Sequence, residues 1–321
     1  MSSILTQYPD ERPFRALTGV SREEFRELLP VFTASYEELL WEAYERNQAT
    51  RQRQPGGGQK GVLNTMDKKL FFILYYWKVY PTFDVLGDRF GCDGSSACTN
   101  VHQLWPVLER TLEKLGVLPA RQFASVEELR AAFGEVEEIF IDATEREVAR
   151  PQDAEEQRKT FSGKKTRNMV KNTLISTACK LILFLGYTVA GSQHDYGRFK
   201  EEFPLDQRDK EGVVSWFRTV KLWVDLGYLG IQKDYDAVEI NIPHKKPRKS
   251  NANPNPTLTE EQKAENRAIS QVRVVVEHAI GGMKRFAILT QSFRNHKDNF
   301  VDTVAVIGAG LWNWKLQCQG V

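Results

Sequence analysis

The sequence predicts a mixed α/β domain that follows an all-α region. Between residues 136 and 242, short apolar runs rich in β-branched and aromatic residues are each followed by polar residues, which is typical of strands. Before these runs, and again after residue 257, apolar residues recur at helical spacing. Strands followed by helices favour a sheet with helices packed on it. With 321 residues, the chain is long enough for two or three domains.

Helical signals dominate the first 50 residues. Ser21 and Glu24 have the spacing of a capping box in front of an apolar helical face. A second helix is predicted over residues 35–46. Residues 51–60, RQRQPGGGQK, then contain three cations, three consecutive glycines and no acid, which predicts a flexible basic linker. This linker is either a solvated loop or a cationic arm for a DNA groove.

Residues 64–118 predict a compact helical module. A helix starts near Thr65, a short one covers residues 81–90, and a third opens at Ser95 after a glycine-containing turn. This order is typical of a helix-turn-helix, although an ordinary helical hairpin is the alternative. In a helix-turn-helix, the polar side chains of the last helix would face base edges. These side chains are Ser95, Ser96, Thr99, Asn100 and Gln103.

The remaining elements follow in order. A linker helix is predicted at residues 125–133, where Ser125 and Glu128 repeat the capping-box spacing. The predicted strands cover residues 136–142, 169–179, 180–187, 221–225 and 238–242, the second and third as a hairpin, and the predicted late helices cover 257–286 and 300–316.

Charge and cysteine usage exclude several classes of protein. The 44 Lys and Arg residues nearly balance the 42 Asp and Glu residues, and the net charge of +2 excludes a histone-like polycation. The four cysteines form no C-x-x-C pair, which favours a reduced, cytoplasmic compartment over a disulfide framework. No signal peptide is visible, and the apolar runs are too short to span a membrane.

Three acidic residues follow apolar runs and are candidate metal ligands. Asp142 ends the run Ile139–Ile141, Asp225 ends Leu222–Val224, and Glu277 follows three valines on a helix, where we expect it to face the core. Converging carboxylates repel one another unless a cation neutralises them, and hard oxygen ligands suit Mg²⁺ or Mn²⁺. Two such ions can activate a water and stabilise the leaving oxygen of a phosphodiester. Each acid taken alone could instead be an ordinary turn or cap residue.

Five motifs occur in a characteristic order: residues 141–145 (IDATE), 161–171 (FSGKKTRNMVK), 191–195 (GSQHD), 223–230 (WVDLGYLG) and 273–286. Together they resemble the catalytic domain of DDE transposases of bacterial insertion sequences, in the subgroup related to Harbinger-type elements. The resemblance covers roughly residues 135–316. Residues 14–118 resemble the helix-turn-helix region that precedes this domain in the family.

The resemblance implies a ribonuclease-H-like, mixed-sheet catalytic domain. Asp142, Asp225 and Glu277 would be its catalytic residues and would hold two Mg²⁺ (or Mn²⁺) ions. The family's helix signature is Tyr-x2-Arg-x3-Glu-x6-Lys; Arg273, Glu277 and Lys284 match it, and Ser270 stands in the place of the Tyr. On one continuous helix, Glu277 and Lys284 would project from the same face.

Cations gather in runs that predict contacts with DNA phosphates. Residues 158–171 carry six cations and no acid, and residues 244–249 carry four more. His194 matches a family motif and could contact the scissile phosphate, act in proton transfer, or be structural. The predicted contacts beyond the helix-turn-helix are Arg51, Arg53, Lys60, Lys164, Lys165, Arg167, Lys171, His194, Lys245, Lys246, Arg273 and Lys284.

By this resemblance, the chain divides into an N-terminal helical region with a possible role in oligomerisation (1–50), a basic linker (51–63), a helix-turn-helix domain (64–118), a linker helix (119–134) and a catalytic domain (135–321). It would bind the terminal inverted repeats of a transposon, cleave to free a 3′-hydroxyl, and join that end to target DNA. We expect a homodimer or higher oligomer on double-stranded DNA, in the bacterial cytoplasm at the nucleoid. The alternatives are a metal-dependent endonuclease without strand transfer and a domesticated, non-catalytic DNA-binding protein.

Overall fold

The computed structural model describes residues 3–47, 54, 61–163, 165–206, 216–251, 254–297 and 299–320. The chain packs into two compact units. The helical unit comprises Met1–Leu118, Met283–Gln291 and Thr303–Val321, and the sheet unit comprises Pro119–Gly282 and Ser292–Asp302. Packing thus groups the last helix with the N-terminal region, whereas the division into consecutive domains made from the sequence stays a prediction.

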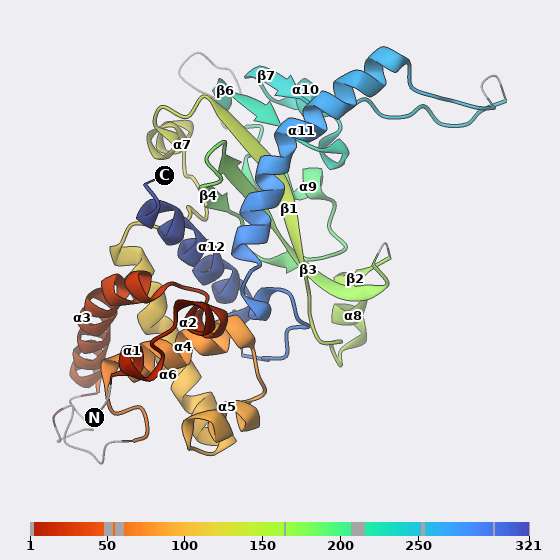
Figure 1. Ribbon diagram of the computed structural model, residues 1–321. Coiled ribbons are helices and arrows are strands. Elements are labelled where there is room, and N and C mark those ends of the chain that lie inside the picture. The colour runs from red at the N-terminus through yellow and green to blue at the C-terminus, as the bar shows by residue number, and fades with distance from the viewer. Residues whose placement is uncertain are drawn as a thin grey trace. The chain divides into compact units, whose positions relative to one another are not determined.

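The helical unit begins with α1 (Ile4–Gln7), α2 (Glu11–Thr18) and α3 (Arg22–Arg46) (Figure 1). The capping box at Ser21 and Glu24 is confirmed at the start of α3. The separate helix predicted over residues 35–46 is wrong, because α3 continues without a break through Pro30. Phe25, Phe32 and Ser35 are all buried. One buried face therefore continues through the position where we expected a second helix to begin.

The next three helices have the predicted order. They are α4 (Met66–Val79), α5 (Phe83–Phe90) and α6 (Gly94–Lys114), and α5 and α6 pack against each other. Asp93 caps α6 by accepting a hydrogen bond from the Ser96 N–H at 2.8 Å. A Cβ at Gly87 would lie 2.5 Å from the Cys92 carbonyl oxygen, so the close approach of α5 to the turn requires glycine there.

Two later stretches of the chain complete the helical unit. The 3₁₀ helix η2 (Ala287–Leu289) contacts α4, and α12 (Phe300–Cys318) has most of its length in this unit. The Lys78 ammonium donates to the Arg285 carbonyl at 2.7 Å, and the Asn313 amide donates to the Val117 carbonyl at 3.0 Å. Residues more than 190 positions apart are therefore bonded within one unit. No helix in the described part of the chain is long and apolar enough to cross a membrane.

The sheet unit is built on a mixed sheet, with strand order β2-β3-β1-β6-β7. Its central strand β1 (Glu138–Glu147) pairs antiparallel with β3 (Arg167–Thr177) and parallel with β6 (Phe217–Trp223), which pairs parallel with β7 (Ala237–Asn241). The short strands β2 (Phe161–Ser162), β4 (Ile182–Leu185) and β5 (Val189–Ala190) pair with β3. The predicted α/β class and the predicted hairpin of β3 and β4 are confirmed.

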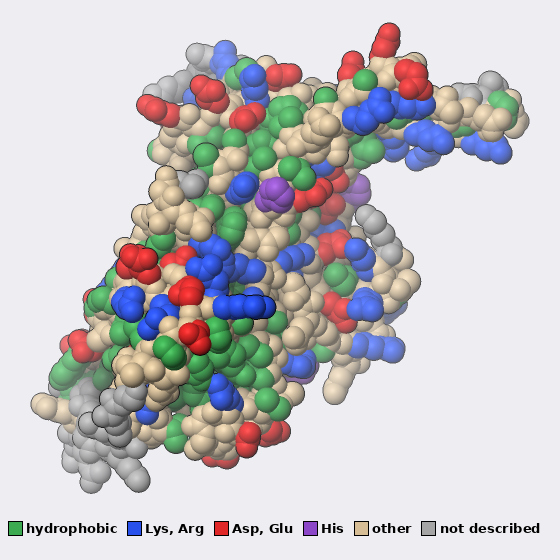
Figure 2. Space-filling view, in the orientation of Figure 1, with side chains coloured by type: hydrophobic (Ala, Val, Ile, Leu, Met, Phe, Trp, Pro, Cys, Tyr) green, Lys and Arg blue, Asp and Glu red, His purple; other side chains and the backbone are tan. Residues whose placement is uncertain are grey.

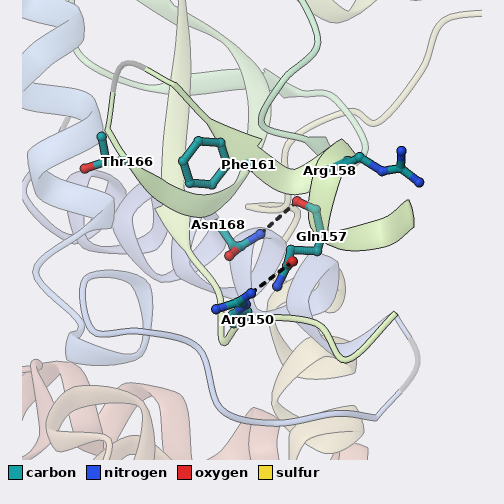
Figure 3. Close-up of a pocket in the computed structure, with 6 residues that line it drawn as sticks. All are labelled: Arg150, Gln157, Arg158, Phe161, Thr166 and Asn168. Atoms are coloured by element: carbon teal, nitrogen blue, oxygen red, sulfur yellow. Dashed lines mark hydrogen bonds between the residues drawn. The ribbon is translucent and has the colours of Figure 1, made fainter. Parts of the chain in front are cut away.

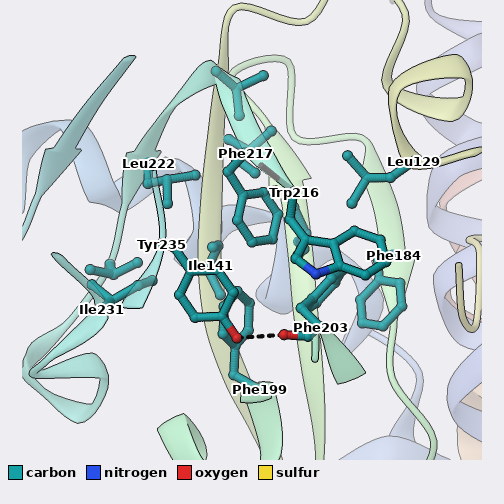
Figure 4. Close-up of a cluster of buried hydrophobic side chains, with 14 of the residues drawn as sticks. Leu129, Ile141, Phe184, Phe199, Phe203, Trp216, Phe217, Leu222, Ile231 and Tyr235 are labelled. Carbon is teal, nitrogen blue, oxygen red and sulfur yellow. Dashed lines mark hydrogen bonds between the residues drawn. The ribbon is translucent and has the colours of Figure 1, made fainter. Parts of the chain in front are cut away.

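Strand alternation gives the sheet two different faces. Ile139, Ile141, Leu222 and Val224 are buried in an aromatic core, where the Tyr235 hydroxyl donates to the Phe203 carbonyl at 2.6 Å (Figure 4). The elements that contribute to this core are α7 (Val126–Phe133), α9 (Asp195–Glu202), η1 (Leu226–Tyr228) and α10 (Ile231–Asp234). The intervening residues of β1 and β6 face the other side.

On that other side, the rings of Phe140 and Trp223 stack with centroids 6.0 Å apart. The long helix α11 (Glu260–Met283) contacts this face, where Arg273 pairs with Asp142 of β1. The short helix α8 (Ala154–Thr160) contacts β3. The two faces of β1 therefore differ in chemistry: one is an apolar core, and the other carries charged residues.

A buried polar network joins β1, β3 and residues 301–302. The Arg146 guanidinium donates to the Val301 carbonyl at 2.7 Å and to Asn172 Oδ1 at 2.9 Å. Asp302 accepts from Arg121 Nη2 at 2.6 Å and from the Thr188 N–H at 2.7 Å. This network ties the start of α12 to the edge of the sheet.

Candidate active site

The register of β1 and β6 places two predicted site residues side by side. The last parallel pair is Phe140 with Trp223. Asp142 and Asp225 each lie two residues beyond that pair, in matching positions and on the same face of the sheet. The two strands stop pairing at this point, and the charge of Asp225 raises the pKa of Asp142, so the two carboxylates are close enough to repel each other. The predicted proximity of Asp142 and Asp225 thus follows from the strand register.

The local setting of Asp142 differs from the prediction. We expected it to end its strand, but β1 continues to Glu147 through its antiparallel pairing with β3, where Asp142 lies opposite Leu174. The apolar run of the sequence ends at Asp142, because residues 143–147 are mostly polar. Their backbone is nevertheless paired with β3, so the strand continues. Only the pairing with β6 ends near Asp142. Asp225 does end its strand, and its carboxylate accepts a hydrogen bond from the Gly227 N–H at 2.8 Å.

The Asp142 carboxyl has an unusual protonation equilibrium. Its pKa is raised from 3.8 to about 6: burial is the largest cause, Arg273 and the Ala143 N–H lower the pKa, and the negative charges of Asp225 and Asp195 raise it. Arg273 Nη2 lies 3.2 Å from Asp142 Oδ2. Without DNA, the guanidinium of Arg273 is directed at Asp142, and its predicted contact with DNA stays a prediction.

A second charged pair lies in the same site. The Lys171 side chain is only 7% exposed, and its ammonium lies 2.7 Å from Asp195 Oδ1, 2.8 Å from the Gln193 carbonyl and 3.9 Å from Glu145. Lys171 was predicted to contact DNA from the surface. Without DNA, the ammonium is enclosed among acceptors in the acidic site, and its contact with DNA stays a prediction.

Sequence reasoning missed two residues of this site, Asp195 and Tyr228. Asp195 lies beside the Asp225 loop: a Cβ at Gly227 would be 3.3 Å from Asp195 Oδ2. The Tyr228 hydroxyl is buried without a hydrogen-bond partner among the described residues. Burial raises its pKa well above the usual value, and Asp142, Asp195 and Asp225 add to the rise. The motif at residues 191–195 was the available signal for Asp195, whereas no local pattern marks Tyr228.

Glu277 lies apart from the two aspartates. We expected it to face the core, but it is exposed, and Val276 and Ala279 are the buried residues of that stretch of α11. Its position is four residues after Arg273, which places it on the same side of α11 one turn further along. Among the described residues, no group of three His, Cys, Asp or Glu side chains is arranged to hold a metal ion.

The donor chemistry of the pair Asp142 and Asp225 nevertheless fits a divalent cation. Both ligands are hard carboxylate oxygens, and their mutual repulsion is the kind that a cation relieves. Arg273 supplies one positive charge to this pair in the structure.

The predicted DNA contacts on surface elements have different settings. On α6, Ser95, Thr99 and Gln103 are exposed at intervals of four residues and form a polar stripe. Ser96 and Asn100 are half-buried beside it; Ser96 Oγ donates to Asp93 at 2.7 Å, and the Asn100 amide donates to the Ser96 carbonyl at 2.8 Å. The exposed face of α6 is thus polar, as predicted.

The basic stretch after β7 is exposed. Lys245 and Lys246 lie on it, and Lys and Arg side chains gather along this projecting segment (Figure 2). Asn266 of α11 anchors it through two hydrogen bonds, accepting from the His244 N–H at 2.7 Å and donating to the His244 carbonyl at 3.0 Å. The backbone just before Lys245 and Lys246 is therefore held to α11, while their side chains are exposed to solvent.

The other predicted contacts are placed as follows. His194 is exposed at the start of α9, Lys165 is exposed, and Arg167 is exposed but pairs with Glu147 at 2.5 Å. Lys284 follows the end of α11 at Met283, so the expected single helix through Glu277 and Lys284 is corrected. Arg51, Arg53, Lys60 and Lys164 lie outside the described residues, as does most of the predicted basic linker.

Comparison with protein families agrees with a helix-turn-helix region followed by an α/β domain. Residues 141–313 match the family described as DDE superfamily endonuclease, and residues 62–114 match the helix-turn-helix of DDE superfamily endonucleases. The chain belongs to the DDE superfamily endonucleases, and the predicted helix-turn-helix is confirmed.

A curated relative extends the similarity along the chain. The protein is 27% identical over 308 residues to a probable transposase for insertion sequence element IS702 from Microchaete diplosiphon, across 95% of each chain. The resemblance to DDE transposases of insertion sequences, stated from the motifs, is thereby confirmed. No solved structure matches the chain significantly.

Proposed function

We propose that this protein is the transposase of a bacterial insertion sequence. It binds the terminal inverted repeats of its element through residues 64–118, hydrolyses a phosphodiester to free a 3′-hydroxyl, and joins that end to target DNA. The observation that carries the proposal is the matched position of Asp142 and Asp225 just beyond the last β1–β6 pair. The name of the relative and its similarity along 95% of the chain support it.

The proposed metal ligands are Asp142, Asp225 and Glu277. The support for Glu277 is its place on α11, one turn from Arg273, which contacts Asp142. A modest movement of α11 that withdraws Arg273 would bring Glu277 toward the two aspartates. Two bound Mg²⁺ or Mn²⁺ ions would supply a deprotonated water or 3′-hydroxyl and stabilise the leaving oxygen.

The remaining charged residues have supporting roles in this proposal. Lys171 pairs with Asp195 and lies 3.9 Å from Glu145, and its positive charge reduces the repulsion among the carboxylates of the site. The polar stripe of α6 faces base edges, and the basic stretch that includes Lys245 and Lys246 holds phosphates. Because two transposon ends must be held together, we propose at least a homodimer on DNA, acting at the nucleoid in the bacterial cytoplasm.

A cleavage and joining assay tests this function. The full chain is incubated with a labelled transposon end, a target plasmid and Mg²⁺, and the variants Asp142→Asn, Asp225→Asn and Glu277→Gln are compared with it. Each should lower cleavage by at least about 100-fold, since even outer-shell partners of metal ligands contribute about 10–100-fold. Binding to the end should persist. Glu239→Gln is the matched control, because Glu239 is an exposed acid of the same unit that pairs with Lys221.

The outcomes separate the alternatives. Hydrolysis of the end without a joined product would indicate an endonuclease without strand transfer. End binding by the wild-type chain without any hydrolysis would indicate a non-catalytic DNA-binding protein. Full cleavage by Asp142→Asn would remove Asp142 from the proposed triad.

A further inference from the structure

A cavity of about 440 Å³ lies where α8, β2 and the start of β3 meet (Figure 3). Its volume is in the range of about 300–1,000 Å³ that is typical of small-ligand sites. Asn168 in its wall is six residues along β3 from Leu174, the partner of Asp142, which is roughly 20 Å in an extended strand. The two proposed metal ligands on the sheet, Asp142 and Asp225, do not line this cavity. The described residues that line it are Arg150, Gln157, Arg158, Phe161, Thr166 and Asn168.

The lining combines an exposed aromatic ring with two cations. Phe161 is 45% exposed, and no ring of the described residues stacks on it. Figure 3 shows its ring between Thr166 and Arg158 in the view, with Arg150 below. Arg150 donates to Gln157 Oε1 at 3.2 Å and Arg158 to the Ala154 carbonyl at 3.2 Å, and in the described residues neither pairs with a carboxylate. Each guanidinium has further N–H donors for a ligand.

The wall of the cavity is preorganised. Asn168 is only 9% exposed, and its amide donates to the Gln157 carbonyl at 3.0 Å and to Thr160 Oγ1 at 2.8 Å. These bonds fix the end of α8 to β3, while β2 pairs Phe161 with Asn168. The Phe161 ring and the arginines are thus held on a fixed frame, which lowers the entropic cost of binding.

We propose that this cavity binds an unpaired nucleotide of a DNA strand, whose base stacks on Phe161 while its flanking phosphates contact Arg150 and Arg158. Stacking on an aromatic ring together with arginine contacts to the backbone is the general mode of binding to single-stranded nucleic acid. A base inside a duplex is covered by its neighbours and cannot stack on Phe161. The inference rests on the proposed function, because it takes DNA as the substrate.

The surroundings leave room for the strand to continue. Arg150 also lines a second cavity, of about 700 Å³, with His296 and Lys297 in its wall. A strand held at Phe161 would therefore have room to continue past Arg150, in a cavity whose wall carries Lys297 and the acids Asp153 and Glu156.

Fluorescence anisotropy of the full chain with a labelled single strand, and with a duplex of the same sequence, tests the proposal. Phe161→Ala should weaken single-strand binding by about 5- to 100-fold, the range that corresponds to one stacked base, and leave duplex affinity within about twofold. Phe161→Trp should restore single-strand binding. Val238→Ala is the matched control, because Val238 is another exposed apolar side chain of the same unit and is 60% exposed.

Photocrosslinking gives a readout that a folding defect would not produce. A single strand containing 5-iododeoxyuridine should crosslink to Phe161, as mapped by mass spectrometry, and Arg150→Gln with Arg158→Gln should reduce that crosslink. Equal loss of single-strand and duplex affinity in Phe161→Ala, no loss at all, or crosslinks only elsewhere would overturn the proposal. Competition by a deoxynucleoside monophosphate as effective as the strand would overturn the DNA strand as the ligand.

The two proposals fail in different ways. If the chain cleaves no transposon end but its single-strand affinity depends on Phe161, the proposed transposase function fails and the nucleotide site stands. If cleavage and joining proceed while Phe161→Ala binds the single strand as tightly as the wild-type chain, only the nucleotide-site proposal fails.

Discussion

Two Arg–Asp pairs of the sheet unit are equally buried but differently bonded. In the pair Arg121–Asp302 the side chains are 17% and 23% exposed, and in Arg273–Asp142 they are 15% and 23% exposed. Asp302 accepts two short bonds from Arg121 and two from Thr188, each between 2.6 and 2.7 Å. Asp142 accepts from Arg273 at 3.2 Å and from the Ala143 N–H at 2.8 Å.

The surrounding charges differ as well. Asp302 lies near two cations, Arg121 and the buried Arg146. Asp142 lies near two further carboxylates, Asp225 and Asp195, which raise its pKa. Equal burial therefore leaves the two carboxylates differently bonded: Asp302 has its acceptors filled, whereas Asp142 retains capacity for a ligand.

Truncation of the two aspartates should separate their roles most strongly. Asp302→Ala leaves the buried Arg146 and Arg121 without their carboxylate and should lower the free energy of unfolding by about 3 kcal/mol. Asp142→Ala should cost clearly less, because it also removes the repulsion with Asp225. Urea denaturation of the metal-free chain measures both, and equal losses would contradict the distinction.

Removal of the two arginines should affect cation binding differently. Arg273→Met takes a positive charge away from the proposed metal ligands and should raise Mn²⁺ affinity by up to about tenfold, or about 1.4 kcal/mol. Arg121→Met should leave this affinity unchanged. Titration calorimetry without DNA measures both variants. A lower Mn²⁺ affinity in Arg273→Met would mean that Arg273 positions Asp142 for binding instead of competing for it.

The raised pKa of Asp142 predicts a pH dependence. Because the pKa is about 6 in the folded chain, well above the ordinary 3.8, the proton is favoured by folding. This group therefore adds stability to the metal-free chain as pH falls from about 6 toward 4. Protons also compete with the cation, so Mn²⁺ affinity should decline as pH drops through about 6. Calorimetry across this range checks the decline, and an affinity that is flat with pH would contradict it.

The smallest expected effect compares two buried tyrosines. The Tyr235 hydroxyl donates to the Phe203 carbonyl, whereas the Tyr228 hydroxyl has no described partner. Tyr235→Phe should lose about 1 kcal/mol of unfolding free energy, and Tyr228→Phe should be neutral or slightly stabilising. Thermal denaturation distinguishes them. A loss in Tyr228→Phe equal to that in Tyr235→Phe would show that its hydroxyl is satisfied after all.

Local signals were sufficient for most elements of the fold. Caps such as Ser21 and short apolar runs such as Ile139–Ile141 predicted the helices and strands, because these signals act between neighbouring residues. The continuation of β1 to Glu147 was not predictable in this way, since it depends on pairing with β3. For α3, we predicted a new helix at residue 35, but the buried face continues through Ser35 and the helix is not interrupted.

The candidate site was predicted only in part. Asp142 and Asp225 were singled out because each follows an apolar run in the sequence. The burial of Lys171 and its pairing with Asp195 result from the tertiary fold, so a basic run in the sequence could not reveal them. The exposure of Glu277 depends on which face of α11 packs against the sheet unit. Three adjacent valines lie on different faces of a helix and do not indicate which one is buried.

The composition of the helical unit from three separated stretches has a consequence for biosynthesis. The Val117 carbonyl obtains its bond from Asn313, and a Cβ at Gly310 would meet Leu118 at 2.7 Å, so these distant segments are closely packed. Residues 1–118 are synthesised before residues 303–321. The helix-turn-helix can therefore complete its packing only after the sheet unit between them has been translated. Products of premature termination would lack this last helix, so a completely packed helix-turn-helix would form only in chains that also carry Asp142, Asp225 and Glu277.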